Sequence, residues 1–122
     1  MSKKILIVDD DPDIVDLLEN RLQFTGYNTI STKDARTAME QIKKDSPDLI
    51  ILDIMMPGID GTKLCWILKK GEKYQSIPII IISAKKSGDV KRLTELVNAD
   101  AFIPKPFEAE VLLKKVNQLL DE

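Results

Sequence analysis

The sequence has no histidine and one cysteine, Cys65, among its 122 residues. Without histidine, the chain cannot form a histidine metal site, a histidine-dependent catalytic group or a phosphohistidine of its own. With one cysteine it cannot close an intrachain disulfide, which favours a reducing compartment. No apolar run approaches the roughly 20 residues of a membrane-spanning helix, and the four apolar residues between Lys4 and Asp9 are too few for a signal peptide. We therefore expect a cytoplasmic protein that does not bind a membrane.

An excess of positive charge is also missing. Lys and Arg together number 18, Asp and Glu number 20, the net charge is −2 and the pI is about 5.2. This balance argues against a nucleic-acid-binding surface, which needs clustered positive charge. The hydrophobic fraction of 43% is typical of a globular chain. Because a domain averages about 150 residues, we expect a single domain over residues 1–122.

Short apolar runs alternate with helical patterns along the chain. The runs Ile5 to Val8, Leu49 to Leu52 and Ile79 to Ile82 are continuous and rich in β-branched residues, as in strands buried on both faces. Two weaker strand candidates are Asn28 to Thr32 and Asp100 to Ile103. Five apolar stripes at helical spacing follow the strands: Ile14, Leu17, Leu18 and Leu22, interrupted by Arg21; Ala35, Ala38, Met39 and Ile42; Leu64, Ile67 and Leu68; Val90, Leu93 and Val97; and Leu112, Val116, Leu119 and Leu120. Five strand–helix repeats predict an α/β fold, with a parallel sheet covered by helices on both faces.

The polarity of the strands indicates their order. The three apolar strands are expected in the centre of the sheet, and the polar strand Asn28 to Thr32 at one edge. The last strand ends at Pro104, which cannot donate a ladder hydrogen bond and therefore suits the other edge. The order 2-1-3-4-5 satisfies both conditions, and it is one of the two common doubly wound orders. In this order the ligand crevice lies at the carboxyl ends of the first and third strands.

Acidic residues follow these two strands. Asp11 is a suitable N-cap for the first helix, with Pro12 at its first position, but capping does not explain Asp9 and Asp10 directly after a buried strand. Asp53 follows the third strand, so the three carboxylates of Asp9, Asp10 and Asp53 are expected to converge. Because like charges repel, such a cluster must bind protons or a cation. Carboxylate oxygens suit Mg²⁺, which usually takes one or two carboxylates together with phosphate oxygens.

A hydroxyl and an ammonium group follow the last two strands. Ser83 ends the fourth strand and Lys105 follows the fifth, so both are expected beside the acidic cluster. Each is a suitable partner for phosphoryl oxygens. Together with a metal-binding carboxylate cluster, they indicate phosphoryl transfer to an aspartate.

With these residues in place, the chain resembles the response-regulator receiver domain of two-component signalling over essentially its whole length. Four motifs carry the resemblance: Ile7 to Asp11, Leu52 to Gly61, Ile82 to Ala84 and Ala99 to Phe107. Asp53 precedes Ser83 by 30 positions and Lys105 by 52, and both spacings fit the family. The resemblance implies one receiver domain with a doubly wound, flavodoxin-like (βα)5 fold.

The resemblance assigns the acidic residues to phosphoryl acceptance and metal binding. It implies that Asp53 is the phosphoacceptor. Asp10 and Asp53 would coordinate Mg²⁺ or Mn²⁺ together with the backbone carbonyl of Met55, and Asp9 would assist through water. Met55 and Lys85 stand two residues beyond Asp53 and Ser83, where family members flank the path of attacking water, so their bulk predicts a shielded, slowly hydrolysed acyl phosphate.

The remaining motif residues match the phosphoryl-binding and switch positions of the family. Ser83, Ala84 and Lys105 would contact the phosphoryl group, and Phe102 would turn inward on activation. The bond between Lys105 and Pro106 is expected to be cis. Asn98 stands where the family usually has glycine at the end of the fourth helix. Because Asn tolerates the left-handed conformation, the fold should be unaffected.

The resemblance implies a phosphorylation-activated signalling switch rather than a turnover enzyme. The donor would be a sensor histidine kinase or a histidine phosphotransfer protein. Phosphorylation would change the partner preference of the surface formed by the fourth helix, fifth strand and fifth helix. The target would be a downstream protein or an output domain outside this chain, and a phosphorylation-dependent homodimer stays open. The alternatives are a phosphorylation-independent interaction module with the same fold and, with less support, a small phosphatase. For Cys65 and Trp66 we expect partial packing in the third helix.

Overall fold

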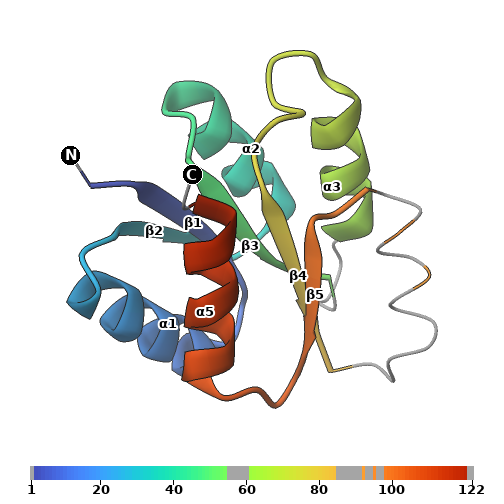
Figure 1. Ribbon diagram of the computed structural model, residues 1–122. Helices are drawn as coiled ribbons and strands as arrows, with labels where there is room; N and C mark the ends of the chain where they lie inside the picture. The colour runs from blue at the N-terminus through green and yellow to red at the C-terminus, as the bar shows by residue number, and fades with distance from the viewer. Residues whose placement is uncertain (1, 55–60, 85–91, 93–94, 96–97, 121–122) are drawn as a thin grey trace.

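Five short parallel strands form one sheet (Figure 1). The computed structural model describes residues 2–54, 61–84, 92, 95 and 98–120. The strands are β1 (Lys4–Val8), β2 (Asn28–Thr32), β3 (Leu49–Asp53), β4 (Ile79–Ser83) and β5 (Ala101–Pro104). Their order is β2-β1-β3-β4-β5, which confirms the predicted order 2-1-3-4-5 and places the polar strand β2 at an edge.

Helices cover both faces of the sheet. The described helices are α1 (Pro12–Phe24), α2 (Ala35–Lys44), α3 (Gly61–Lys70) and α5 (Ala109–Leu120). In Figure 1, α1 and α5 lie on one face and α2 and α3 on the other. The predicted fourth helical stripe, Val90, Leu93 and Val97, lies outside the described residues. No helix in the described part of the chain is both long and apolar enough to span a membrane.

Successive side chains of each central strand alternate between two separate hydrophobic cores, one on each face of the sheet. Ile5 and Ile7 pack with α1 and α5, whereas Leu6 and Val8 pack with α2 and α3. Successive strand side chains point to opposite faces, and here both faces are covered. This is why the runs from Ile5 to Val8, Leu49 to Leu52 and Ile79 to Ile82 are continuously apolar, and all five residues of β3 and of β4 are buried, including the polar Asp53 and Ser83 at their ends.

The first helix begins as the sequence predicts. Asp11 is its N-cap, and a carboxylate oxygen of Asp11 accepts a hydrogen bond from the amide of Asp13 at 3.0 Å. Pro12 occupies the first turn, where a missing amide hydrogen costs nothing. The chain therefore leaves β1 through three residues and turns at once into α1, which keeps Asp9 and Asp10 at the end of the sheet.

Several apolar residues of the predicted stripes are exposed. Leu17 of α1 is 36% exposed, and Trp66 and Ile67 of α3 are 46% and 43% exposed, whereas Cys65 is fully buried. The prediction of partial packing is therefore confirmed for the half-buried Trp66, whereas Cys65 is packed completely. Periodicity locates the centre of a buried stripe, but neighbouring elements decide how wide a strip they cover.

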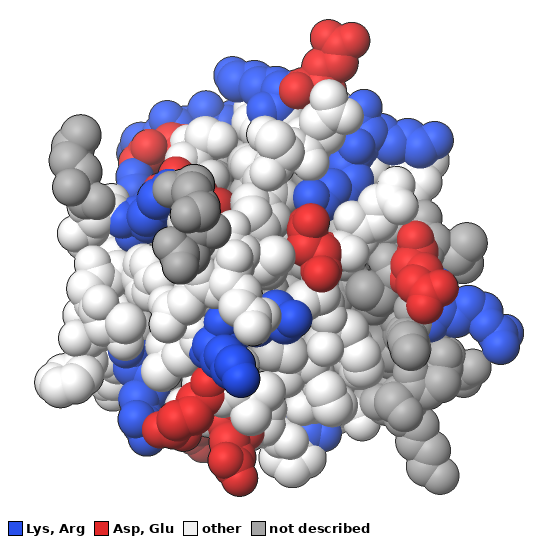
Figure 2. Space-filling view, in the orientation of Figure 1, with Lys and Arg blue, Asp and Glu red and all other residues white. Residues whose placement is uncertain are grey.

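Two backbone features carry residues expected to be special. Asn98 has a φ of 60°, in the left-handed region, where Gly is the preferred residue and Asn the next best. The Lys105–Pro106 peptide bond is cis. On the face shown in Figure 2, the coloured basic and acidic side chains are interspersed, in keeping with the nearly balanced composition.

Candidate functional site

The polar residues singled out above meet at the carboxyl edge of the sheet. Asp53 and Ser83 are the last residues of β3 and β4, Asp9 directly follows β1, and Lys105 directly follows β5. The strand registers bring them level, because Val8 pairs with Leu52 and Ser83 pairs with Pro104. Parallel strands end at the same edge, so four separate segments of the chain contribute to one site.

Three carboxylates form the centre of the site. One carboxylate oxygen from each of Asp9, Asp10 and Asp53 lies within 4.8 Å of the others. Asp9 and Asp53 are only 1% and 3% exposed, whereas Asp10 is exposed to solvent. A carboxylate oxygen of Asp9 also accepts a hydrogen bond from the amide of Asp11 at 3.0 Å. The cluster is thus buried at its base and open at Asp10.

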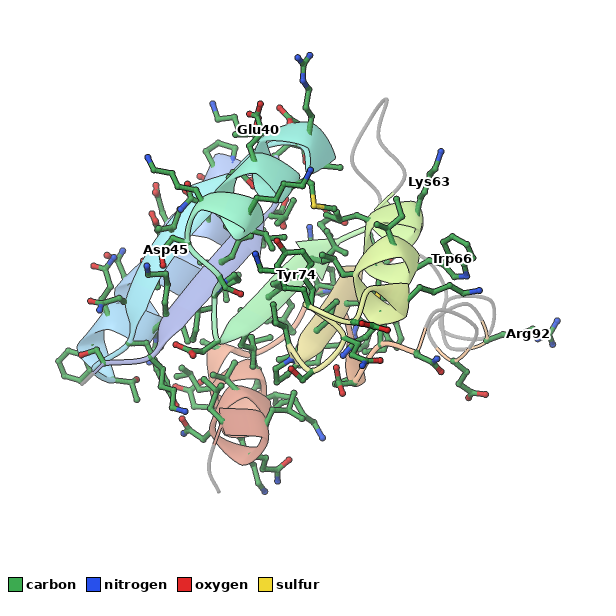
Figure 3. All side chains as sticks on the ribbon, turned by 90° about the horizontal axis from the view of Figure 1, so that it is seen from above. Glu40, Asp45, Lys63, Trp66, Tyr74 and Arg92 are labelled. Atoms are coloured by element: carbon green, nitrogen blue, oxygen red, sulfur yellow. The ribbon has the colours of Figure 1, made fainter. Side chains whose placement is uncertain are left out.

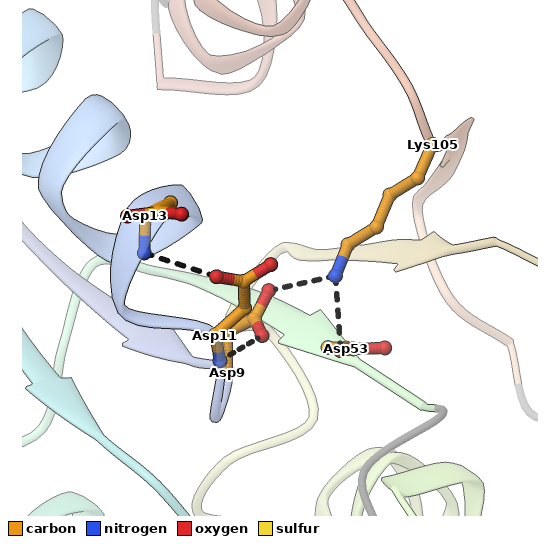
Figure 4. A network of polar contacts seen from close by, with 5 residues as sticks. All are labelled: Asp9, Asp11, Asp13, Asp53 and Lys105. Atoms are coloured by element: carbon orange, nitrogen blue, oxygen red, sulfur yellow. Dashed lines mark hydrogen bonds and ion pairs between the residues drawn. The ribbon is translucent and has the colours of Figure 1, made fainter.

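Lys105 joins two of these carboxylates (Figure 4). Its Nζ lies 3.0 Å from Oδ2 of Asp9 and 3.1 Å from Oδ2 of Asp53, and its side chain is 16% exposed. The backbone amide of Lys105 donates to the carbonyl of Ser83 at 2.8 Å, which ties the lysine to the end of β4. One ammonium group therefore bridges the ends of β1 and β3 from beyond β5.

Burial and neighbouring charges shift the pKa values of Asp9 and Lys105. Burial raises the pKa of Asp9, and the neighbouring Asp53 charge adds to this, although the Asp11 amide and Lys105 act in the opposite direction. For Lys105, burial lowers the pKa, but the hydrogen bonds to Asp9 and Asp53 outweigh it, so the net shift is upward. Lys105 is therefore held in its charged form beside the carboxylates.

The site can hold a metal ion. Three carboxylates and one ammonium group leave an excess of two negative charges among the described residues that meet here. A divalent cation would cancel this excess, and clustered carboxylate oxygens are the ligands that hard divalent cations prefer. The exposed side of the cluster at Asp10 gives such a cation access from solvent.

The other predicted site residues lie around this centre. Ser83 is fully buried, and Ala84 after it is exposed. Phe102 of β5 pairs with Ile81 and packs, partly buried, against the core on the α2 and α3 side. Met55 and Lys85 lie outside the described residues.

Thr32, at the end of β2, contacts the site without having been predicted there. Its carbonyl accepts a hydrogen bond from the amide of Asp9 at 3.1 Å. Its hydroxyl is buried, and among the described residues it has no hydrogen-bond partner. The pairing of Thr32 with Val8 could have indicated this position, since both strands end together at the site.

Comparisons with known proteins give the family of this chain. A family model described as the response regulator receiver domain matches residues 5–117. The signal receiver domain of a signal transduction histidine kinase from Syntrophus aciditrophicus is 35% identical, with a TM-score of 0.90 over 98% of this chain and 90% of that chain. A CheY-like response regulator receiver domain protein from Methanospirillum hungatei JF-1 is 30% identical, with a TM-score of 0.91 over 99% and 95% of the two chains. The BeF3-activated N-terminal receiver domain of RstA from Klebsiella pneumoniae is 30% identical, with a TM-score of 0.85 over 98% and 99%. The chain therefore belongs to the response regulator receiver domain family of two-component signalling.

Proposed function

We propose that this chain is a phosphorylation-activated switch in which Asp53 accepts a phosphoryl group. The observation that carries the proposal is the convergence of three carboxylates within 4.8 Å, with Lys105 contacting both Asp9 and Asp53. Asp53 is the central carboxylate, since it ends β3 between the ends of β1 and β4. A relative, RstA, has been solved in a BeF3-activated state.

The transfer step uses an oxygen of Asp53 as the nucleophile. That oxygen forms a bond to phosphorus, and the bond between phosphorus and the donor nitrogen or oxygen breaks with its electron pair leaving on the donor. We propose a sensor histidine kinase or a histidine phosphotransfer protein as the donor, and its phosphohistidine would lie outside this sequence, which contains no histidine. Hydrolysis of the acyl phosphate returns Asp53 to its carboxylate form and resets the switch.

Different residues around Asp53 would bind the metal ion and the phosphoryl oxygens. Asp10 and Asp53 would hold Mg²⁺ or Mn²⁺ with the backbone carbonyl of Met55, and Asp9 would act through water. The bound cation would neutralise charge on the phosphoryl oxygens. Lys105 supplies a fixed ammonium group beside Asp53, and Ser83, with Ala84, stands at the end of the neighbouring strand. The Lys105 ammonium group and the Ser83 hydroxyl can bind phosphoryl oxygens as negative charge develops on those oxygens.

Activation would be transmitted through Ser83 and Phe102. Ser83 ends β4, and Phe102 lies on the neighbouring edge strand β5, where it packs against the core on the α2 and α3 side. A shift of the Ser83 hydroxyl toward the phosphoryl group opens space for Phe102 to turn inward. This changes the partner preference of the surface made by the fourth helix, β5 and α5, for a downstream protein, an output domain or a second copy. We place this switch in the cytoplasm, where its kinase would act.

Labelling with a small phosphodonor tests the proposal. The purified chain is incubated with acetyl phosphate and Mg²⁺, and intact mass spectrometry should show one added phosphoryl group. The label should disappear with EDTA and in Asp53→Asn, and persist in the matched surface variant Asp16→Asn. Equal labelling of Asp53→Asn and the parent would overturn the assignment. No labelling of the parent would favour a phosphorylation-independent interaction module.

A further inference from the structure

The outward side of α3 carries an unusual set of side chains. Lys63, Trp66, Ile67 and Lys70 recur at positions i, i+3, i+4 and i+7, which places them on one helix face. All four are exposed, including 46% of Trp66 and 43% of Ile67. Figure 3 shows Lys63 and Trp66 projecting away from the sheet. We call these four residues the α3 outer face.

The opposite side of the same helix is already apolar and occupied. Leu64, Cys65 and Leu68 are buried against the core beneath α3. A surface helix normally has a polar outer side, whereas the outer side of α3 places the half-exposed apolar side chains of Trp66 and Ile67 next to each other. Trp66 is also the residue type most enriched at the energetic centres of protein interfaces. The α3 outer face therefore has the composition of a surface that a partner covers.

The charges on this face have one sign. The helix α3 contains three lysines and no acidic residue, although the whole chain has a net charge of −2. Lys69 is engaged inward, where its Nζ lies 2.7 Å from a carboxylate oxygen of Asp100. Lys63 and Lys70 bracket the apolar pair, and Nζ of Lys70 lies 4.4 Å from the centre of the Trp66 ring. An apolar centre with a lysine at each end is complementary to an apolar centre with an acidic group at each end.

We propose that the α3 outer face docks an acidic amphipathic helix of a partner protein. Seven residues of helix span about 10 Å, so the partner would carry two acidic residues about seven positions apart, with apolar side chains between them. Those side chains would pack on Trp66 and Ile67, and the two carboxylates would pair with Lys63 and Lys70. This contact is independent of phosphoryl transfer and uses none of the residues assigned to it.

A second copy of this chain does not supply such a helix from its described parts. In α1, the residues seven positions after Asp13 and Asp16 are Asn20 and Gln23. In α5, the residue seven positions after Glu110 is Asn117, and α2 contains a single acidic residue, Glu40. Two bracketing lysines on a chain of net charge −2 also give little attraction for a lipid surface or a nucleic acid, whose binding grows with the number of clustered cations.

Trp66 is the only tryptophan in the chain, so its fluorescence reports on this face alone. The probe is a 15-residue, amide-capped helical peptide with two glutamates seven positions apart and two leucines between them. A twin peptide carries lysines in place of the glutamates. We expect the glutamate peptide to shift Trp66 emission to shorter wavelength and to saturate at millimolar concentration or below, and the lysine peptide to bind at least tenfold more weakly.

Charge reversal makes the test specific. The variant Lys63→Glu/Lys70→Glu should lose binding of the glutamate peptide and gain binding of the lysine peptide. A misfolded protein would not show such a gain. Phe24→Ser, which removes a 93% exposed apolar side chain from α1, should bind like the parent. The proposal would be overturned if both peptides bound equally, if neither gave a saturable change in Trp66 emission, or if the reversed variant did not exchange its preference. A larger change in emission with phosphatidylserine vesicles or duplex DNA than with the glutamate peptide would overturn it as well.

Discussion

The ammonium nitrogen of Lys69 lies 2.7 Å from a carboxylate oxygen of Asp100, and this ion pair joins α3 to the start of β5. The same nitrogen donates to the carbonyl of Ile77 at 2.8 Å, and the same carboxylate oxygen accepts from the amide of Ile79 at 2.8 Å. The Lys69 side chain is 9% exposed and that of Asp100 is 34% exposed. One pair therefore fastens a helix, a loop and two strands at the end of the sheet opposite the site.

Removing one partner of this pair should destabilise the protein. Asp100→Ala leaves the buried Lys69 ammonium group without its counter-charge and the Ile79 amide without its acceptor. Breaking a fully buried pair costs about 3–5 kcal/mol, and the partial exposure of Asp100 reduces our expectation to about 2–3 kcal/mol in the free energy of unfolding by urea. The exposed pair of Arg21 and Glu110 provides the control, because Glu110→Ala should cost less than about 1 kcal/mol. Equal losses in the two variants would contradict the prediction.

Replacing the Thr32 hydroxyl should stabilise the protein. The hydroxyl is buried without a partner among the described residues, and an unsatisfied buried polar group costs about 1–3 kcal/mol. Thr32→Val has nearly the same shape, so we expect a gain of about 1 kcal/mol in urea unfolding. Thr37→Val should instead lose stability, because the Thr37 hydroxyl donates to Asp34 at 2.8 Å. A loss of stability in Thr32→Val would show that its hydroxyl has a partner in solution.

The buried thiol of Cys65 should make the free energy of unfolding decrease at alkaline pH. The same burial should keep the thiol unreactive in the folded protein. Burial raises the pKa of its thiol to about 11 from 9.0, with opposing effects from Lys69 and Asp100. An unfolded thiol ionises at lower pH than the folded one, so the contribution of Cys65 to stability is complete below about pH 9 and is lost as the pH rises toward 11. The parent should therefore lose more stability than Cys65→Ala over this interval. The native protein should also resist a thiol reagent at pH 8 and react fully in urea.

The ammonium group of Lys105 should compete with a cation for the acidic cluster. It lies 3.0 Å and 3.1 Å from carboxylate oxygens of Asp9 and Asp53. Unit charges about 5 Å apart interact by about 3 kcal/mol at an effective dielectric constant near 20, so we expect Lys105→Met to bind Mg²⁺ at least ~5-fold more tightly by calorimetry at pH 8. Its labelling by acetyl phosphate should nevertheless be slower, because the ammonium group that we propose to bind the phosphoryl oxygens is gone. Lys114→Met, on the exposed side of α5, should behave like the parent; weaker Mg²⁺ binding in Lys105→Met would contradict the prediction.

Local pattern was sufficient to predict the architecture. Continuous apolar runs identify β1, β3 and β4 because both faces of these strands are covered, and the polarity of Asn28 to Thr32 identifies an edge. The cap at Asp11 was equally predictable, because capping depends on residues adjacent in sequence. Placing Asp9, Asp10 and Asp53 together needed one further rule, that parallel strands end at a common edge.

Only the tertiary structure decided which side chains touch and which stay exposed. The contact of Lys105 with Asp9 spans 96 positions, and neither that pairing nor the pairing of Lys69 with Asp100 leaves a periodic trace in the sequence. Trp66 and Cys65 are adjacent and both apolar, yet one is half exposed and the other fully buried. Hydrophobic periodicity depends on a residue's position around its own helix, whereas exposure and ion pairing depend on what the other elements place against it.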